Sequence, residues 1–288
     1  MIDYLEELLN EIENIRVGNP SISRYLDLYK SILKIMARHR DRLIEDNKRI
    51  QMETHIRGLV DKLLEADKPL IRLIPIHRLS LHGYIDMFID ILREIPIWAP
   101  EYGGHVDRIL SRMESDEMDV EALFKGFLVD GGLKSIDNQV EAMILYFALS
   151  MACRPLVGSL TEYIDRFLRD RWWRGWCPVC GRKPVVGRIR RGDKKRYMVC
   201  PLCGLEFLVD LFYCPNCENV EPTRFIFLDF EDFPEYSIHV CEECRHYIKV
   251  IDENRVRDRI PRGLEDILTI PLDIIAMDEG YRREWILI

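Results

Sequence analysis

Eight cysteines in the C-terminal half of the chain stand in four Cys-x-x-Cys pairs. Nineteen residues separate the first two pairs, and 23 separate the last two. Two intervening residues let a tight turn aim both sulfurs at one ion, and two such turns complete a tetrahedral four-sulfur site. We therefore expect two metal centres, the first formed by Cys177, Cys180, Cys200 and Cys203 and the second by Cys214, Cys217, Cys241 and Cys244.

The spacing leaves the pairing and the metal open. The four pairs could also interleave, and four thiolates suit either zinc or a single rubredoxin-like iron. A structural role is favoured at both centres, because small β modules with thin cores gain folding free energy from a bound metal. A redox role for one pair is the minority interpretation, since no thioredoxin-like βαβ pattern surrounds any of them.

The residue after each pair separates the two centres. Gly181 and Gly204 follow the two pairs of the first centre, where a positive φ is needed to close the turn without strain. Glu218 and Arg245 stand at the matching positions of the second centre. We therefore expect the second centre to be less regular, or more open.

The rest of the chain shows no catalytic motif. It contains no Walker loop, no G-x-G-x-x-G and no H-E-x-x-H, and its seven histidines are scattered, so we expect no enzymatic activity. Cys153 lies in the longest apolar stretch, Ala142 to Cys153, and is expected to be a packed core thiol. That stretch is short of the roughly 18 residues that indicate a membrane span, so we expect a buried helix and no membrane insertion.

The N-terminal sequence indicates the compartment. "MIDYLEELLNEIENIR" is acidic and amphipathic and does not resemble a secretory signal. A cytoplasmic location is therefore expected, and stable disulfides are rare there. Paired cysteines in such a protein are more often metal ligands.

Charge is unevenly distributed along the sequence. The formal net charge is −8, but Arg166 to Cys200 carries twelve basic residues against two aspartates and is therefore +10. A basic patch on an acidic body indicates either a binding surface or a solvated hairpin. The candidate partner-binding residues are Arg188, Arg190, Arg191, Lys194, Lys195 and Arg196.

Periodicity divides the chain into helical and strand-rich parts. Apolar residues recur at three- and four-residue steps through about residue 170, whereas short β-branched and aromatic runs follow to about Val250. We expect an α+β, mainly α protein. Its predicted parts are a helical domain (1–170), two zinc-ribbon or rubredoxin-like modules (171–211 and 212–255), and a C-terminal helix (256–288) that packs back on the helical domain and bends at Pro271.

The quoted cysteine motifs resemble those of one family. "WRGWCPVCG", "CPLCGLEF", "CPNCEN" and "CEECRHYIKV" occur in the order found in the formate dehydrogenase accessory protein family, FdhE. The tail "LEDILTIPLDIIAMDEGYRR" resembles that family's C-terminal segment. The likeness covers Arg171 to Arg283, with Phe207 where the family often has Trp and with a more basic insert between the first two pairs.

The resemblance implies a non-enzymatic, cytoplasmic maturation factor with two metal ions, zinc or iron. The implied partner is the immature molybdenum- or tungsten-containing catalytic subunit of a formate dehydrogenase. Two alternatives remain. A nucleic-acid-binding zinc-ribbon protein would use the basic segment, although the acidic remainder argues against it. A rubredoxin-like electron-transfer protein would hold iron in one centre.

Overall fold

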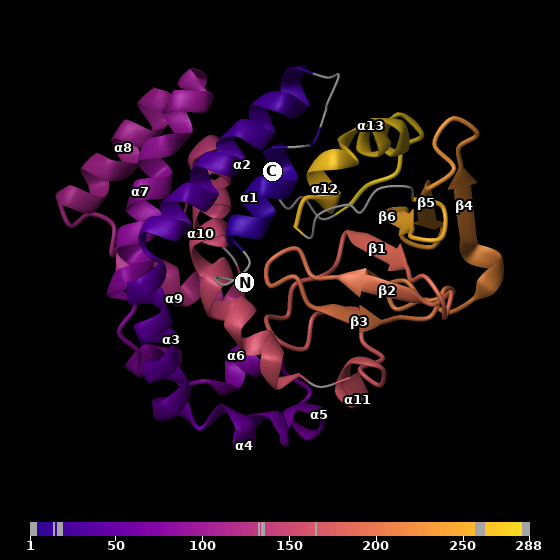
Figure 1. Cartoon of the computed structure of the whole chain (residues 1–288), viewed down its shortest axis with the longest axis horizontal. Coiled ribbons are helices and arrows are strands. Elements are labelled where there is room, and N and C mark those ends of the chain that lie inside the picture. Colours follow the sequence, from indigo (N-terminus) through magenta and orange to yellow (C-terminus); the bar gives the residue numbers. More distant parts are fainter. Residues whose placement is uncertain are drawn as a thin grey trace. The chain divides into compact units, whose positions relative to one another are not determined.

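A computed structural model describes residues 5–13, 15, 20–131, 133, 136–164, 166–256 and 263–283 (Figure 1). Its chain forms two compact units. The described residues of the first unit fall within 5–63 and 70–160, and those of the second within 64–69 and 161–283. Every described helix longer than nine residues belongs to the first unit and every described strand to the second. The predicted mainly helical α+β class is confirmed.

The first unit is a helical bundle. Its helices are α1 (Leu5–Glu13), α2 (Pro20–Arg38), α3 (Arg40–Thr54), α4 (Ile56–Val60), α6 (Leu70–Leu73), α7 (His82–Trp98), α8 (Gly103–Glu114), α9 (Val120–Asp130) and α10 (Gln139–Ser159), with the single turns η2 (Ile76–Arg78) and η3 (Pro100–Tyr102) between them. α5 (Leu63–Ala66) and η4 (Leu160–Tyr163) lie where the chain passes between the units.

α7 and α10 form the centre of this bundle. On α7 the side chains of Tyr84, Phe88, Ile91 and Leu92 are fully buried at three- and four-residue steps, as an amphipathic helix requires. α7 contacts α2, α8 and α10. Cys153 of α10 is also fully buried, in the core position that its apolar surroundings predicted.

α10 is longer than its apolar stretch indicated. Gln139–Tyr163 is long and apolar enough to cross a membrane by length and composition alone. However, 72% of its most apolar window is buried inside the structure, against α3, α7, α8 and α9. A helix whose surface is already covered by protein is expected to be the core helix of a bundle.

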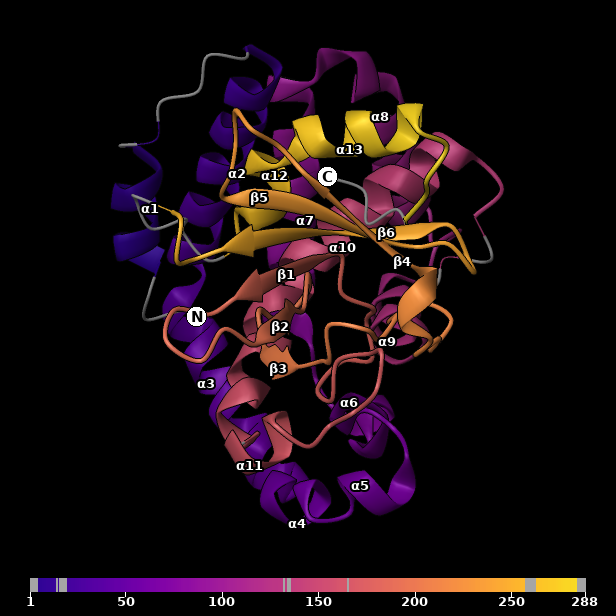
Figure 2. The same ribbon diagram turned by 90° about the vertical axis from the view of Figure 1, so that its right-hand side faces the viewer.

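The second unit is built on one six-stranded sheet (Figure 2). Its strands are β1 (Val186–Ile189), β2 (Arg196–Val199), β3 (Glu206–Leu208), β4 (Phe225–Asp229), β5 (Tyr236–Cys241) and β6 (His246–Asp252). The spatial order is β3-β2-β1-β6-β5-β4, with every neighbouring pair antiparallel except β1 and β6. The single turns α11 (Arg166–Arg169) and η5 (Pro222–Arg224) precede β1 and β4.

The sheet joins two modules of the same plan. Each module has a cysteine pair, two antiparallel strands, a second cysteine pair and a third strand. The sequence predicted these as two separate modules. In the structure, parallel pairing of β1 with β6, from Val186↔Lys249 to Ile189↔Asp252, makes them one sheet. The predicted domain boundaries themselves stay predictions.

The C-terminal segment contributes two short helices, α12 (Glu265–Leu268) and α13 (Ile270–Asp278). The break falls at Thr269, two residues before the predicted bend, and Pro271 then lies in the first turn of α13, where its missing N–H removes no intrahelical hydrogen bond. Leu272 and Ala276 of α13 pack with Ile238 and Tyr247 of the sheet. Packing of this segment on the helical domain stays a prediction.

A buried ionic network ties the C-terminal segment to the sheet. Lys249 of β6 is fully buried, and its Nζ lies 2.5 Å from Asp266 and 2.8 Å from Asp273. Arg283 contacts the same two carboxylates, and the Tyr247 hydroxyl donates a hydrogen bond to Asp273. Burial alone would raise the pKa of Asp266, but Lys249 and Arg283 lower it below the ordinary value. The network therefore stabilises the fold at neutral pH, and this contribution is lost as the pH falls through the carboxyl range.

Replacing Lys249 by methionine tests this network. The K249M variant keeps the length of the side chain but leaves two buried carboxylates with Arg283 as their remaining cation. We expect the free energy of unfolding to fall by about 3 kcal/mol in urea titrations of the metal-loaded protein. K48M, at an exposed lysine of α3, is the control and should change it by less than about 0.5 kcal/mol. Equal stability of the two variants would contradict a structural role for the network.

Candidate metal centres

The first centre is a closed, buried set of four sulfurs. The Sγ atoms of Cys177, Cys180, Cys200 and Cys203 all lie within 4.8 Å of one another, and all four residues are buried. The Cys177–Cys203 and Cys180–Cys200 sulfurs are 3.4 and 3.3 Å apart. These distances are far longer than a disulfide bond of about 2.05 Å. They approach the roughly 3.8 Å edge of a tetrahedron of sulfurs about 2.3 Å from a zinc ion.

The second centre has the same composition but is more open. The sulfurs of Cys214, Cys217, Cys241 and Cys244 also lie within 4.8 Å of one another, with 3.6 Å between Cys214 and Cys244 and 3.7 Å between Cys217 and Cys241. Cys217 is exposed and Cys244 is half-buried. The structure thus groups the eight cysteines in chain order without interleaving, and the expectation of a more open second centre agrees with this exposure.

The four cysteine turns share one backbone geometry. The residue after each pair has a positive φ, +75° and +72° at Gly181 and Gly204 and +60° and +59° at Glu218 and Arg245. In each turn its N–H donates to the carbonyl of the first cysteine, at 2.7 to 3.0 Å. The turns of the second centre are therefore as regular as those of the first, contrary to one of the two expectations, and two of them form without glycine.

The thiols of the first centre are better suited to metal binding than to reaction as free thiols. Burial raises the pKa of Cys177 and of Cys203 well above the ordinary thiol value. Four thiolates this close would repel one another strongly in a buried site unless a cation lay between them. Four sulfurs and no oxygen or nitrogen donor suit zinc or iron, and a four-cysteine set that leaves no open position is typical of a structural centre.

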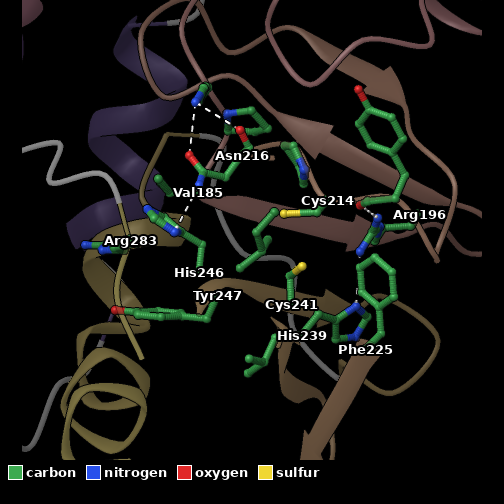
Figure 3. A pocket seen from close by; sticks show the side chains of 16 residues that line it. Val185, Arg196, Cys214, Asn216, Phe225, His239, Cys241, His246, Tyr247 and Arg283 are labelled. Atoms are coloured by element: carbon green, nitrogen blue, oxygen red, sulfur yellow. Dashed lines mark hydrogen bonds between the residues drawn. The ribbon is translucent and has the colours of Figure 1, made fainter. Parts of the chain in front are cut away.

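Polar groups around the second centre orient and balance it (Figure 3). His246 Nδ1 lies 3.0 Å from the carbonyl oxygen of Cys244 and 3.0 Å from the side-chain nitrogen of Asn216. Burial opposes ionisation of Cys244, but hydrogen bonds from Asn216 and the backbone N–H of His246 lower its pKa to about 6. These contacts favour the thiolate form that a metal requires.

Arg196 supplies a buried positive charge beside this centre. It is 4% exposed, donates to the carbonyl oxygens of Asp210 and Tyr213, and has Nη1 3.4 Å from Nδ1 of His239 (Figure 3). Burial lowers the pKa of Arg196 to about 10, so it remains charged at neutral pH. Burial, then Arg196, lowers the pKa of His239 to about 3, so this histidine is neutral. Because four thiolates around a divalent ion carry −2, Arg196 is positioned to offset part of that charge.

The basic insert is largely committed to the fold. Arg188 is 4% exposed, and its guanidinium lies 3.0 Å from Glu253 and 2.6 Å from Glu265. Arg190 lies 2.6 Å from Glu206 and over the ring of Tyr197. Arg188 and Arg196 are therefore structural residues and unavailable to a partner, which corrects two of the six predicted surface residues.

The exposed part of the insert is the β1–β2 turn. Arg191, Lys194 and Lys195 are exposed, and Arg191 donates to the backbone carbonyl of Glu253. The partner-binding hypothesis therefore rests on this turn. The sequence did not reveal that Arg188 is buried, because its acidic partners lie up to 77 residues away along the chain. All four residues of β2 are buried, so no alternation marked Arg196 as internal.

Gly175 explains part of the motif that precedes the first cysteine pair. A Cβ atom at this position would lie 2.3 Å from the backbone oxygen of Pro215, in the first turn of the second centre. The neighbouring Trp172 is fully buried and donates from Nε1 to the carbonyl of Trp176 at 2.6 Å. The segment before the first centre therefore packs directly against the second.

The difference in exposure predicts an order of metal release. A chelator with an absorbance readout, mixed with metal-loaded protein, should withdraw one equivalent quickly and the other at least tenfold more slowly, because it reaches Cys217 directly. The C217S variant should lose the fast phase, whereas C180S should lose the slow one. Release of both equivalents in one phase would contradict the contrast between the centres.

Substitution of Gly175 tests the contact between the two centres. G175A forces a methyl group against backbone that cannot rotate away, so we expect the free energy of unfolding to fall by about 1–3 kcal/mol and the fast phase of metal release to accelerate. G58A makes the same chemical change in α4, where a Cβ meets nothing within 4 Å, and should be neutral or stabilising. Wild-type stability and release kinetics in G175A would show that the backbone there moves freely.

Comparison with known proteins locates relatives for both the sequence and the fold. A family profile described as FdhE, central domain, matches residues 176–209, which contain the whole first centre. An FdhE homologue from Aquifex aeolicus is 30% identical over 149 residues, covering 51% of this chain and 52% of the relative. One from Serratia proteamaculans is 26% identical over 204 residues, covering 68% and 62%. The chain thus aligns with about half to three-fifths of these relatives' length.

The fold has a solved counterpart along nearly the whole chain. The crystal structure of the FdhE protein from Pseudomonas aeruginosa matches with a TM-score of 0.65 at 20% identity, covering 99% of this chain and 94% of that one. At this identity the match establishes the fold. The resemblance to the FdhE family is thereby confirmed, and residues 176–209 match the profile of that family's central domain.

Proposed function

We propose that the protein is a non-enzymatic accessory factor in the maturation of formate dehydrogenase. On this proposal it binds the immature molybdenum- or tungsten-containing catalytic subunit in the cytoplasm. The observation that carries it is the first centre: four buried cysteine sulfurs, within the residues that match the FdhE central domain. A centre without an open coordination position holds a structure together and offers no site for a substrate.

The eight cysteines are, on this proposal, ligands of two metal ions. A metal bound by each set would hold together the two cysteine turns of its module and supply folding free energy. The chain's own residues then perform the function: they present a rigid sheet and its turns to the client. The turn with Arg191, Lys194 and Lys195 is the candidate contact for an acidic part of the client.

Electron transfer is the second candidate, favoured by the exposure of Cys217 at the second centre. Iron in a four-cysteine site colours the protein red when oxidised and undergoes a one-electron change. A nucleic-acid role has less support, because Arg188, Arg190 and Arg196 are engaged within the second unit. Protein that contains only zinc after anaerobic preparation from iron-replete cells would count against the electron-transfer role.

Affinity capture tests the accessory role. The tagged protein is isolated anaerobically from its own host, and bound proteins are identified by mass spectrometry, with nucleic acid assayed in the same eluate. We expect a molybdopterin-type formate dehydrogenase catalytic subunit, which should be lost in a C177A/C180A variant. The K194E/K195E variant should recover several-fold less of it, because the candidate contact is electrostatic. K48E/R57E, with the same charge change at exposed residues of the helical unit, is the control.

The outcomes separate the candidate functions. An eluate rich in RNA or DNA and lacking such a subunit would favour the nucleic-acid role. Undiminished capture by K194E/K195E would exclude the β1–β2 turn as the contact and leave the accessory role in place.

A further inference from the structure

The two edge strands of the sheet differ in length and in how far other elements cover them. β3, at one edge, has three residues and is contacted by α11. β4, at the other edge, has five residues, and none of them is buried. Among the described residues no strand pairs with the outer side of β4. An exposed, regular edge strand is a template for a further strand.

The register shows which backbone groups face outward. Glu242 N–H donates to the carbonyl of Arg224 at 2.8 Å, so this pair is a hydrogen-bonded one. Such pairs alternate along antiparallel strands. Phe227 and Asp229, paired with His239 and Ser237, therefore direct their N–H groups away from β5.

The side chains along this edge favour an extended segment with two unlike faces. On one face Phe227 and Asp229 line a groove of about 270 Å³ together with Glu235, Asp252 and Arg255, and Arg255 pairs with Asp252 at 3.5 Å, so the carboxylates of Asp229 and Glu235 carry the groove's uncompensated charge. Neither Asp229 nor Glu235 forms an ion pair within the described part of the chain. On the other face Ile226 is 38% exposed. A strand added here would place every second side chain beside carboxylates and the others beside an apolar surface.

Charge around the edge specifies the sign of the partner. Residues 218–243 carry eight acidic side chains and one arginine, a net charge of −7. Two copies of this edge would repel each other, whereas a basic segment would be attracted. Four of the acids, at positions 229, 231, 232 and 235, lie at the end of β4 and in the turn to β5.

We propose that the outer edge of β4 is a docking site for an extended, basic segment of the client polypeptide, which adds to the sheet as a seventh strand with alternating basic and apolar side chains. The inference rests on the proposed function for the identity of the partner. It supplies a site of recognition that neither the metal centres nor the β1–β2 turn provides. Main-chain hydrogen bonds would contribute affinity, and the acidic groove would contribute selectivity.

Peptide binding to the metal-loaded full chain tests the proposal. The probe is a fluorescent ten-residue peptide of alternating lysine and valine. The control peptide has glutamate at every lysine position. We expect the lysine peptide to bind, to weaken as salt rises, and to slow amide hydrogen exchange at Phe227 and Asp229. The glutamate peptide should not bind. N-methylation of the peptide's backbone amides should weaken binding at least tenfold when the methylated amides lie on the edge that faces β4. Methylation of the amides on the opposite edge should leave binding unchanged.

Charge reversal supplies the matched variants. E231K/D232K should weaken binding of the lysine peptide about tenfold. E114K/E117K, at exposed residues near the end of α8, should leave its binding affinity unchanged. The proposal is overturned by absence of binding at millimolar peptide, or by binding that leaves the two amides unprotected. Concentration-dependent dimerisation that protects them would also overturn it, since the edge would then pair with a second copy.

The same variants separate this inference from the proposed function. If E231K/D232K captures the catalytic subunit from the host as well as wild type does, the β4 site is wrong and the accessory role stands. If wild type captures no such subunit, the accessory role is wrong, and the peptide measurements still decide whether the edge is a docking site.

Discussion

The close approach of four sulfurs in each module is the constraint on which the second unit depends. Each module has only three strands, so a cation bound by its four sulfurs would add folding free energy that a small core does not supply. Joining β1 to β6 lets the two modules share one sheet, and Gly175 brings the first segment against the turn at Pro215. The centres therefore support each other through backbone contacts as well as through their own sulfurs.

Buried charge is the second organising feature of this unit. Lys249 and Arg188 are held inside by carboxylates from the C-terminal segment, Asp266, Asp273 and Glu265. Such networks add modest net stability but make removal of one partner costly. Arg188 and Arg190 of the basic insert are paired with carboxylates within the unit. The exposed charge is therefore concentrated at two places, a basic β1–β2 turn and an acidic β4–β5 hairpin.

Sequence patterns predicted what is local and missed what is long-range. Cysteine spacing identified both four-sulfur sets, and glycine after a pair identified the left-handed turn at Gly181 and Gly204. The same turn at Glu218 and Arg245 was not foreseen, because the hydrogen bond back to the first cysteine imposes it on residues that ordinarily avoid it. Pairing of β1 with β6 links positions about 60 residues apart, and no local pattern encodes it.

The difference in exposure between the two centres corresponds to a difference between the two edges of the sheet. The first centre is fully buried, and its module ends at the short edge strand beside α11. The second centre has one exposed ligand, and its module ends at the open edge strand β4. Cys241 belongs to β5 and pairs with Phe225 of β4, so a cysteine of the second centre lies directly beside the open edge strand. A metal bound by these cysteines would therefore hold the β4–β5 ladder at its Cys241 end, and a partner that adds to β4 would gain from that rigidity.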